Sequence, residues 1–384
     1  MQKSRLKQWY NKADQRVSLV SKPLPVGFLI VSDNHLIYKD IDMKKYLLTI
    51  GFLLMYATAF CQQFPKIDEA VRIKQLMPKE GKVRMILDTD TYNEVDDQFA
   101  LSYALLSEEK VKVEAIYAAP FYNSLSKSPG DGMEKSYEEI QRLLKLLHIV
   151  QDGLVFRGST NYLKNVSEPI RSEAALDLIQ KAKKSTPEDP LYVVAIGCIT
   201  NVASAILIDP SIINNIVVVW LGGHSLDWPN QREFNLAQDV LAGQVVLNSG
   251  VPLIITPCWP VVSHFHTTLP ELQYYLKGKN KLCDFLYERV AGYHENNQDV
   301  WSKEIWDVVA VAWLINPSWV HTNLVHSPIL TDQVTYSVDR SRHFIRMATS
   351  INRDAIFRDL FSKLTNRFWT LEFIPIRQLS EQIL

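Results

Sequence analysis

The 384-residue sequence contains few cysteines and almost no net charge. Its four cysteines, Cys61, Cys198, Cys258 and Cys283, include no pair in a CxxC spacing, so neither a disulfide framework nor a structural zinc site is indicated. The formal net charge of −1 provides no basic field, so no nucleic-acid partner is expected. With 47% hydrophobic residues, the chain can bury a large core, which excludes disorder as its main state.

The sequence also lacks an apolar run suited to a stable membrane span. The run over residues 46–60 falls about five residues short of the roughly 20 that a membrane helix needs. Two lysines precede this run, and the small residues 57–59 come just before a polar stretch. This is the pattern of a secretory signal peptide, which we place at residues 43–61, although a buried core helix is an alternative. We therefore expect an exported protein, periplasmic or extracellular.

Two further features concern the N-terminal region. Cys61 raises the question of a lipid anchor, but Phe60 stands where a lipoprotein signal needs a small residue, so anchoring is not favoured. Residues 1–42 are polar and precede Met43, the natural start of the signal sequence. We interpret them as a non-native or disordered extension.

Short apolar runs alternate with helical patterns along the rest of the chain. The expected strands are 83–87, 111–117, 191–196, 216–221 and 252–255, and the expected helices begin at residue 96 and cover 137–147, 174–182, 201–208 and 239–248. Residues 64–82 are charged and contain proline, and we expect no regular structure there. The alternation predicts one α/β domain with a Rossmann-like, mostly parallel sheet flanked by helices, which binds its ligand at the carboxyl ends of the strands.

An acidic segment follows the first expected strand. It contains Asp88, Asp90, Glu94, Asp96 and Asp97 within ten residues and ends where a helix begins. Carboxylates held this close repel and raise one another's pKa unless a cation neutralises them, and a hard cation that binds oxygen ligands suits them best. The alternative is that these residues only cap a turn and favour the helix N-terminus. We prefer the cation site because four aspartates are more than capping requires.

Four segments in this order carry a resemblance to a known family. They are Asp88-Thr89-Asp90 with Asp96-Asp97-Gln98-Phe99-Ala100-Leu101, then Ile196-Gly197-Cys198-Ile199-Thr200-Asn201, then Gly222-Gly223 with Arg232-Glu233-Phe234-Asn235, and last Asp307 with Ala310-Val311-Ala312. These segments resemble the DTD…DDxxAL, GPLTN, GG…AEFN and HDPLAVA motifs of the inosine-uridine preferring nucleoside hydrolases. The resemblance implies that residues 64–384 form a nucleoside hydrolase-like domain.

The family resemblance implies a calcium-dependent enzyme that hydrolyses the N-glycosidic bond of ribonucleosides to ribose and free base. It implies that Asp90, Asp97 and Asp307 bind Ca²⁺ together with the backbone carbonyl of Ile196. It also implies that Asp90 is the general base that deprotonates a water molecule, whose pKa the metal lowers.

The resemblance implies contacts to the substrate as well. Asp96 is expected to hydrogen-bond the ribose 2′-hydroxyl, Glu233 and Asn235 the other sugar hydroxyls, and Asn123 is expected to lie near the water. Trp306 is expected to stack on the base, although core packing would explain this tryptophan equally well. Relatives are often homodimers or homotetramers, so we expect one of these assemblies.

The sequence departs from the family pattern at two places. The loop between the second aspartate and the aspartate pair is two residues longer than is usual in the family. In addition, Trp306 stands before the last aspartate, where many relatives have a histidine that is thought to protonate the leaving base. The proton donor and the base preference are therefore left open, and His224 and His294 are candidates for the donor.

Two other functions compete with this hypothesis. Asp88-Thr89-Asp90-Thr91 fits the DxDxT motif of haloacid-dehalogenase-like phosphatases, although the Asp96-Asp97 pair has no explanation there. The other alternative is an exported, non-catalytic ribonucleoside-binding protein, which Trp306 suggests. Release of free base from a nucleoside would distinguish an enzyme from a binding protein.

Overall fold

The computed structural model describes residues 29–32, 35–38, 64–150, 152–293 and 300–372. The chain divides into two compact units, residues 1–63 and 64–384. In the first unit, β1 (Leu29–Ser32) and β2 (His35–Tyr38) form an antiparallel hairpin. The predicted signal peptide at 43–61 and the candidate His294 lie outside the described residues.

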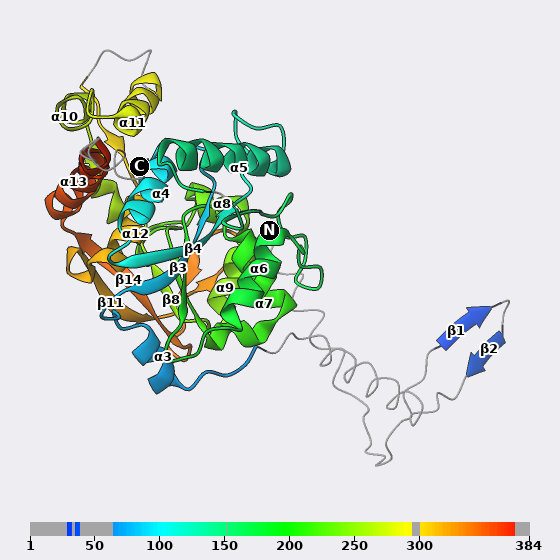
Figure 1. The fold of residues 1–384 in the computed structure, drawn as a ribbon. Helices are drawn as coiled ribbons and strands as arrows, with labels where there is room; N and C mark the ends of the chain where they lie inside the picture. The colour runs from blue at the N-terminus through cyan, green and yellow to red at the C-terminus, as the bar shows by residue number, and fades with distance from the viewer. Residues whose placement is uncertain (1–28, 33–34, 39–63, 151, 294–299, 373–384) are drawn as a thin grey trace, which may run out of the picture. The chain divides into compact units, whose positions relative to one another are not determined.

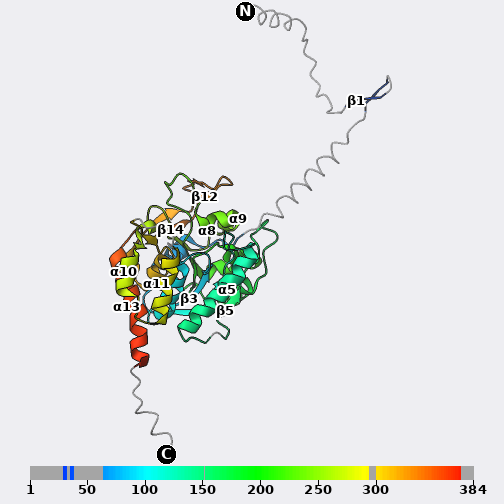
Figure 2. The same ribbon diagram turned by 90° about the horizontal axis from the view of Figure 1, so that it is seen from above.

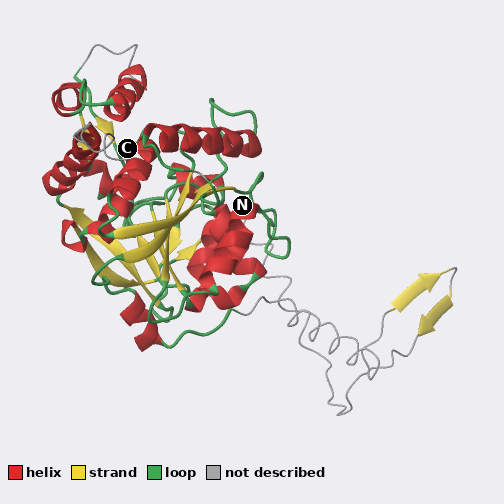
Figure 3. Cartoon of the chain, in the orientation of Figure 1, coloured by secondary structure: helices red, strands yellow, loops and turns green. Residues whose placement is uncertain are grey.

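The second unit is built around an eight-stranded sheet (Figures 1 and 3). Its strands lie in the order β11 (Val320–His326), β14 (Phe344–Ile351), β8 (Leu253–Ile255), β7 (Ile216–Trp220), β6 (Leu191–Ala195), β3 (Val83–Thr89), β4 (Val111–Ala118) and β5 (Val155–Arg157). Only β11 runs antiparallel to its neighbour, β14, and all other adjacent pairs are parallel. This confirms the predicted α/β domain with a mostly parallel sheet.

Helices cover both faces of the sheet. They are α3 (Glu69–Gln75), α4 (Asp96–Leu106), α5 (Pro129–Leu146), α6 (Glu173–Ala182), α7 (Thr200–Ile208), α8 (Phe234–Gln238), α9 (Val240–Ser249), α10 (Leu269–Tyr275), α11 (Lys281–Tyr293), α12 (Val308–Ile315) and α13 (Arg353–Glu372). The helices α10, α11 and α13 lie together at one side of the domain (Figure 2). Among the described residues, no helix is both long and apolar enough to cross a membrane.

Each face of the sheet carries its own hydrophobic core, because successive side chains of a strand point to opposite faces. In β3, Met85 and Leu87 belong to the core that includes α4, α5, α11 and α12. Ile86, between them, belongs to the core with α6, α7 and α9. Burial on both faces explains why the central strands read as continuous apolar runs rather than as alternating ones.

The strand order reverses at β3. From β3 the chain proceeds to β4 and β5 on one side, and then returns to β6, β7 and β8 on the other side. The carboxyl ends of β3 and β6 therefore lie next to each other, with connections that lead away in opposite directions. In open parallel sheets, a crevice forms at such a reversal and binds the ligand.

The expectation of no regular structure at residues 64–82 is wrong, because α3 lies there. The Asp68 carboxylate caps this helix by accepting the backbone N–H groups of Ala70 (2.9 Å) and Val71 (3.4 Å). Glu69 joins the helix to the sheet by accepting the backbone N–H of Phe344, which begins β14, at 2.7 Å. A helix of seven residues shows little periodicity in the sequence, and a helix this short depends on tertiary contacts.

The cap of α3 gives a stability prediction. We expect Asp68→Ala to lower the free energy of unfolding by about 1 kcal/mol, because two helix N–H groups lose their acceptor. Denaturant unfolding measures this change. Glu188→Ala, which removes an exposed carboxylate between α6 and β6, is the control and should leave stability unchanged. Equal midpoints for the two variants would contradict a stabilising role for the cap.

Candidate active site

A cavity of 420 Å³ lies at the reversal of the strand order. It is lined by Asp90, Asn93, Glu94, Asp96, Asp97, Ile196, Leu221, His224, Trp228, Arg232, Glu233, Phe234, Asn235, Cys258, Trp259, Trp306 and Asp307. The structure therefore brings together every site residue that the sequence predicted, except Asn123. We call this cavity the active-site pocket.

Three carboxylates converge at the bottom of the pocket. Asp96 and Asp97 begin α4, and Asp307 directly precedes α12, which packs against α4. All three side chains are buried, and their ligand oxygens lie within 4.8 Å of one another. The helix N-terminus favours negative charge at Asp96 and Asp97, but that alone does not explain a third buried carboxylate beside them.

Burial and mutual repulsion act strongly on these groups. Burial raises the pKa of Asp97 to about 7, although a hydrogen bond from Thr89 opposes the rise. The pKa of Asp307 is raised well above its ordinary value by burial and then by the charges of Asp96 and Asp97. The Thr89 hydroxyl fixes Asp97 by donating to its Oδ1 at 2.5 Å. A cation would remove the cost of keeping these carboxylates ionised.

Asp90 follows β3 and directs a free oxygen into the interior. Its carboxylate is 1% exposed, and within the described part of the chain its Oδ2 has no hydrogen-bond partner. Gly197 permits this arrangement, since a Cβ at that position would lie 3.0 Å from both Cγ and Oδ1 of Asp90. An unpartnered buried carboxylate oxygen is costly, so its presence fits a ligand that is bound during function.

Asp88 belongs to the acidic segment but lies outside the lining of the pocket. Its Oδ1 accepts a hydrogen bond from Asn201 Nδ2 at 2.8 Å, and Asn201 Oδ1 in turn accepts the backbone N–H of Ser159 at 2.7 Å. Asn201 comes from the segment that follows β6. The Asp88–Asn201 contact therefore ties together the two strand ends that form the pocket.

Ile196 and Asn235 are in direct contact. Asn235 Nδ2 donates to the backbone carbonyl of Ile196 at 3.2 Å and to that of Leu221 at 3.1 Å. A carbonyl oxygen has two lone pairs, so the Ile196 carbonyl keeps one for a further ligand. Asn235 thus orients the Ile196 carbonyl, which the family resemblance implies is a metal ligand.

Glu233 is buried and caps α8. Its carboxylate accepts the backbone N–H groups of Gly223 (2.8 Å), Asn235 (2.8 Å) and Leu236 (3.0 Å). Cys258, which lines the same pocket, also hydrogen-bonds this carboxylate, so four donors hold Glu233 in place. The alternative that Glu233 and Asn235 form a surface turn is not observed, since they are 8% and 6% exposed.

The longer loop after Asp90 contributes two residues to the pocket, Asn93 and Glu94. Asn93 Oδ1 accepts a hydrogen bond from Asn123 Nδ2 at 2.7 Å, so Asn123 contacts a lining residue rather than lining the pocket itself. Glu94 forms an ion pair with Lys303, whose side chain is 5% exposed. This ion pair places one buried cation beside the carboxylates. Burial and then the charge of Glu94 raise the pKa of Asp96 well above its ordinary value, and the charge of Lys303 opposes this rise.

Several aromatic rings in the lining of the pocket contact one another, and we call this group the aromatic wall. The rings of Trp228 and Trp259 stack, with centroids 6.0 Å apart and planes 21° apart. Trp306 lies beside Trp259, with ring centroids 6.2 Å apart. Trp228 and Trp259 are 37% and 44% exposed, so their faces remain available to a ligand. Trp306 therefore lines the pocket as part of the aromatic wall, and it also packs against the hydrophobic core.

His224 is the candidate proton donor that the structure places in the pocket. Its Nδ1 accepts the backbone N–H of Trp259 at 3.3 Å, which leaves the ring proton on Nε2. Burial lowers the pKa of His224, so the ring is neutral at neutral pH. Its ring centroid lies 5.7 Å from that of Trp228, within the aromatic wall.

Sequence reasoning missed several lining residues. Trp259 and Cys258 follow the strand at 253–255, so the sequence places them near a strand end. It gives no signal that their side chains line this pocket. Lys303, which pairs with the lining residue Glu94, was missed as well. It lies in β10 (Lys303–Glu304), a two-residue strand that is too short to show a periodic pattern. Its pairing with Glu94 depends on the fold.

Comparison with known proteins identifies the family of this chain. A family model described as inosine-uridine preferring nucleoside hydrolase matches residues 85–358. The chain is 25% identical over 252 residues to the non-specific ribonucleoside hydrolase RihC of Salmonella schwarzengrund, an alignment that covers 62% of this chain and 80% of that protein.

Solved structures of nucleoside hydrolases share the fold. A plant nucleoside hydrolase aligns with a TM-score of 0.60 and 19% identity, over 74% of this chain and 99% of its own. The purine-preferring ribonucleoside hydrolase of Gardnerella vaginalis aligns with a TM-score of 0.61 and 19% identity, over 74% and 98% of the two chains. Because the family model spans well over half of the sequence, the chain belongs to the inosine-uridine preferring nucleoside hydrolase family and is a hydrolase that acts on N-glycosyl bonds.

Proposed function

We propose that this protein catalyses the calcium-dependent hydrolysis of the N-glycosidic bond of ribonucleosides and releases ribose and free base. The observation that carries the proposal is the convergence of Asp96, Asp97 and Asp307 within 4.8 Å, beside the free oxygen of Asp90. The names of the similar proteins, which are ribonucleoside hydrolases, support ribonucleosides as the substrate class.

The proposed metal ligands are the carboxylates of Asp90, Asp97 and Asp307 and the carbonyl oxygen of Ile196. All four are oxygen donors, and the carboxylates come from the acidic segment and from the residue before α12, which suits a cation that accepts about six to eight oxygens in flexible geometry. Bound there, Ca²⁺ would hold two sugar hydroxyls and lower the pKa of a water molecule. Thr89 and Asn235 keep the donors in place through their hydrogen bonds to Asp97 and to the Ile196 carbonyl.

Asp90 is the proposed general base. Its Oδ2 is buried and unpartnered, so it can accept a proton from a water molecule that attacks the sugar. Burial, Asp97 and Asp96 raise the pKa of Asp90, which increases the affinity of its carboxylate for a proton. Gly197 leaves room for this carboxylate, since a Cβ at position 197 would lie 3.0 Å from its Cγ and Oδ1.

The sugar is proposed to lie between the carboxylates and α8. Asp96 accepts the ribose 2′-hydroxyl, and Glu233 and Asn235, which line the same pocket, contact the remaining hydroxyls. Cleavage of a glycosidic bond passes through an oxocarbenium-like state, which buried carboxylates stabilise electrostatically. Asn123 is proposed to act on the water indirectly, through its hydrogen bond to Asn93.

The aromatic wall is proposed to bind the base. Trp306, Trp228 and Trp259 line the pocket with contacting aromatic rings, and a planar base can stack on such rings. His224 Nε2–H is the proposed hydrogen-bond donor to the leaving base, because this ring lies within the same wall. Membership in the nucleoside hydrolase family leaves no support for the phosphatase alternative.

The metal site is tested by Asp97→Asn. We expect calcium binding to be lost and kcat/KM for base release to fall by at least about 100-fold, because the metal contributes several kcal/mol to the transition state. Calcium titration calorimetry and an assay of released base measure the two effects. Asp354→Asn, at a surface carboxylate that is 79% exposed, should retain both. Full activity in Asp97→Asn would refute the assignment, and calcium-dependent nucleoside binding without release by the wild type would support the non-catalytic alternative.

The leaving-group step is tested by Trp306→His. We expect the imidazole to provide the missing acid and to raise kcat by about tenfold or more on ribonucleosides whose bases leave poorly. Trp306→Phe is the matched control, since it also shortens the side chain but carries no proton. The pH profiles of kcat distinguish the two variants. If both variants behave alike, the position does not face the leaving base.

Export is proposed on the pattern at residues 43–61 alone. Sequencing of the N-terminus of the protein recovered from the medium or periplasm should find a start near residues 60–62. Recovery of the chain only from the cytosol with Met1 intact would refute export.

A further inference from the structure

A second cavity, of 480 Å³, lies at the opposite end of the sheet from the active-site pocket. Its lining comes from α3 and the segment before it, the end of α9 with Gly250, His326 at the end of β11, and residues 340–344, which lead into β14. Gly250 and Phe344 lie at the amino ends of the parallel strands β8 and β14, whereas the carboxylates follow the carboxyl end of β3. We call this second cavity the basic pocket.

Positive charge dominates the basic pocket. Its lining includes Lys66, Arg72, Arg340 and Arg342, and among the described residues that line it Glu69 is the one carboxylate. Glu69 is already engaged, since Oε2 accepts from Arg72 Nε at 3.0 Å and Oε1 accepts the backbone N–H of Phe344. The surplus positive charge therefore has no counterpart within the lining.

Three residues that line the basic pocket each have a buried polar atom without a partner among the described residues. Arg72 is 4% exposed, and its Nη1 has no hydrogen-bond partner in the described part of the chain. The same holds there for Arg342 Nε and His343 Nε2. Each unsatisfied buried polar group costs roughly 1–3 kcal/mol, so three such atoms around one cavity require an explanation.

Helix capping explains only part of this arrangement. Arg342 Nη2 donates to the Leu247 carbonyl at 2.6 Å, and the Arg72 guanidinium lies within 3.5–3.9 Å of the Cβ position of Gly250, which ends α9 with a φ of 77°. Cations at a helix C-terminus are stabilising. However, this role uses neither Arg342 Nε nor Arg72 Nη1 and does not involve His343.

His343 lies within the field of both arginines. Burial, followed by the charges of Arg72 and Arg342, lowers its pKa to about 4. The imidazole is therefore neutral at neutral pH, and the charge in the pocket comes from the guanidinium groups. The charge of Asp339 acts on Arg342, but the Asp339 carboxylate accepts its hydrogen bonds from the backbone N–H and the hydroxyl of Ser341.

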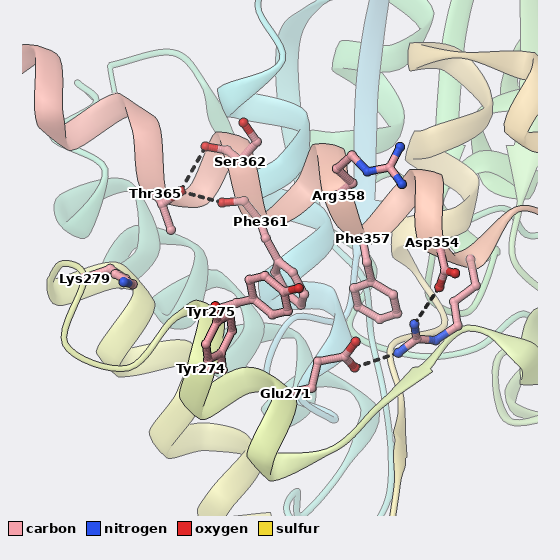
Figure 4. A pocket seen from close by; sticks show the side chains of 11 residues that line it. Glu271, Tyr274, Tyr275, Lys279, Asp354, Phe357, Arg358, Phe361, Ser362 and Thr365 are labelled. Atoms are coloured by element: carbon pink, nitrogen blue, oxygen red, sulfur yellow. Dashed lines mark hydrogen bonds and ion pairs between the residues drawn. The ribbon is translucent and has the colours of Figure 1, made fainter.

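A larger cavity of 820 Å³ between α10 and α13 lacks these properties (Figure 4). One of its arginines, Arg353, pairs with Glu271 at 2.6 Å and with Asp354 at 2.9 Å, and Figure 4 marks both carboxylates with a dashed line. Among the described residues that line this cavity, no buried side-chain nitrogen or oxygen lacks a hydrogen-bond partner. The basic pocket differs because its guanidinium groups keep unused donors.

We propose that the basic pocket is a second ligand site that binds a small phosphate-type oxyanion, either inorganic phosphate or a phosphomonoester. Guanidinium groups suit this chemistry because their donors match the geometry of phosphate oxygens. Arg72 Nη1, Arg342 Nε and His343 Nε2 would then hydrogen-bond to the anion. The cavity is large enough for an ester group beyond the phosphate.

Calorimetric titration of the full chain with inorganic phosphate tests this proposal. The buffer is calcium-free, so that phosphate cannot bind to a metal in the active-site pocket, and its ionic strength is held constant with chloride. We expect saturable binding with a stoichiometry of one. Arg342→Gln should weaken it by about tenfold or more, since it removes a charge-assisted hydrogen bond. Arg171→Gln, an exposed arginine outside the pocket, is the matched control and should not change it.

A second variant covers the case in which Arg342→Gln does not fold. Arg340 is exposed at the rim, so Arg340→Gln should fold and weaken phosphate binding up to about fivefold. A titration with glycerol 3-phosphate separates the two forms of the ligand: tighter binding than phosphate indicates an ester, and equal or weaker binding indicates the free ion. Absence of saturable binding, or equal affinity in Arg340→Gln, Arg342→Gln and Arg171→Gln, would overturn the proposal.

Discussion

The structure depends on the close approach of buried carboxylates at the point where the strand order reverses. Asp96, Asp97 and Asp307 bring their oxygens within 4.8 Å of one another, and Asp90 adds a buried oxygen without a partner. Lys303 is the cation beside them, and it already pairs with Glu94. In a medium of low dielectric constant such a cluster is costly unless a cation joins it. The surrounding fold keeps the carboxylates together through the Thr89 hydroxyl and the packing of α12 on α4.

The active-site pocket has two chemically different halves, and this division matches the two parts of a nucleoside. One half consists of carboxylates, carbonyls and amides, which suit a metal and a sugar. The other half consists of Trp228, Trp259, Trp306 and the neutral ring of His224, which suit a planar base. Under the proposed function, Trp306 belongs to the half that binds the base.

The sequence predicts the acidic half of the site and the central sheet well, because both leave local signals. The buried strands β3, β4, β6, β7 and β8 are short apolar runs, and the aspartates follow the first of them directly. Other features leave no such signal. The helix α3 is too short to show periodicity, and Lys303 reaches Glu94 from a distant segment. Trp259 joins the aromatic wall only because β7 and β8 pair in parallel and place the loops after them side by side.

We propose that a calcium ion completes the carboxylate cluster. The most direct test is denaturant unfolding of the full chain, with Ca²⁺ at about 100 times its dissociation constant or with a chelator in its place. We expect Ca²⁺ to raise the free energy of unfolding by about 2.7 kcal/mol, because the folded chain binds the ion and the unfolded chain does not. The same unfolding midpoint with Ca²⁺ and with the chelator would contradict it.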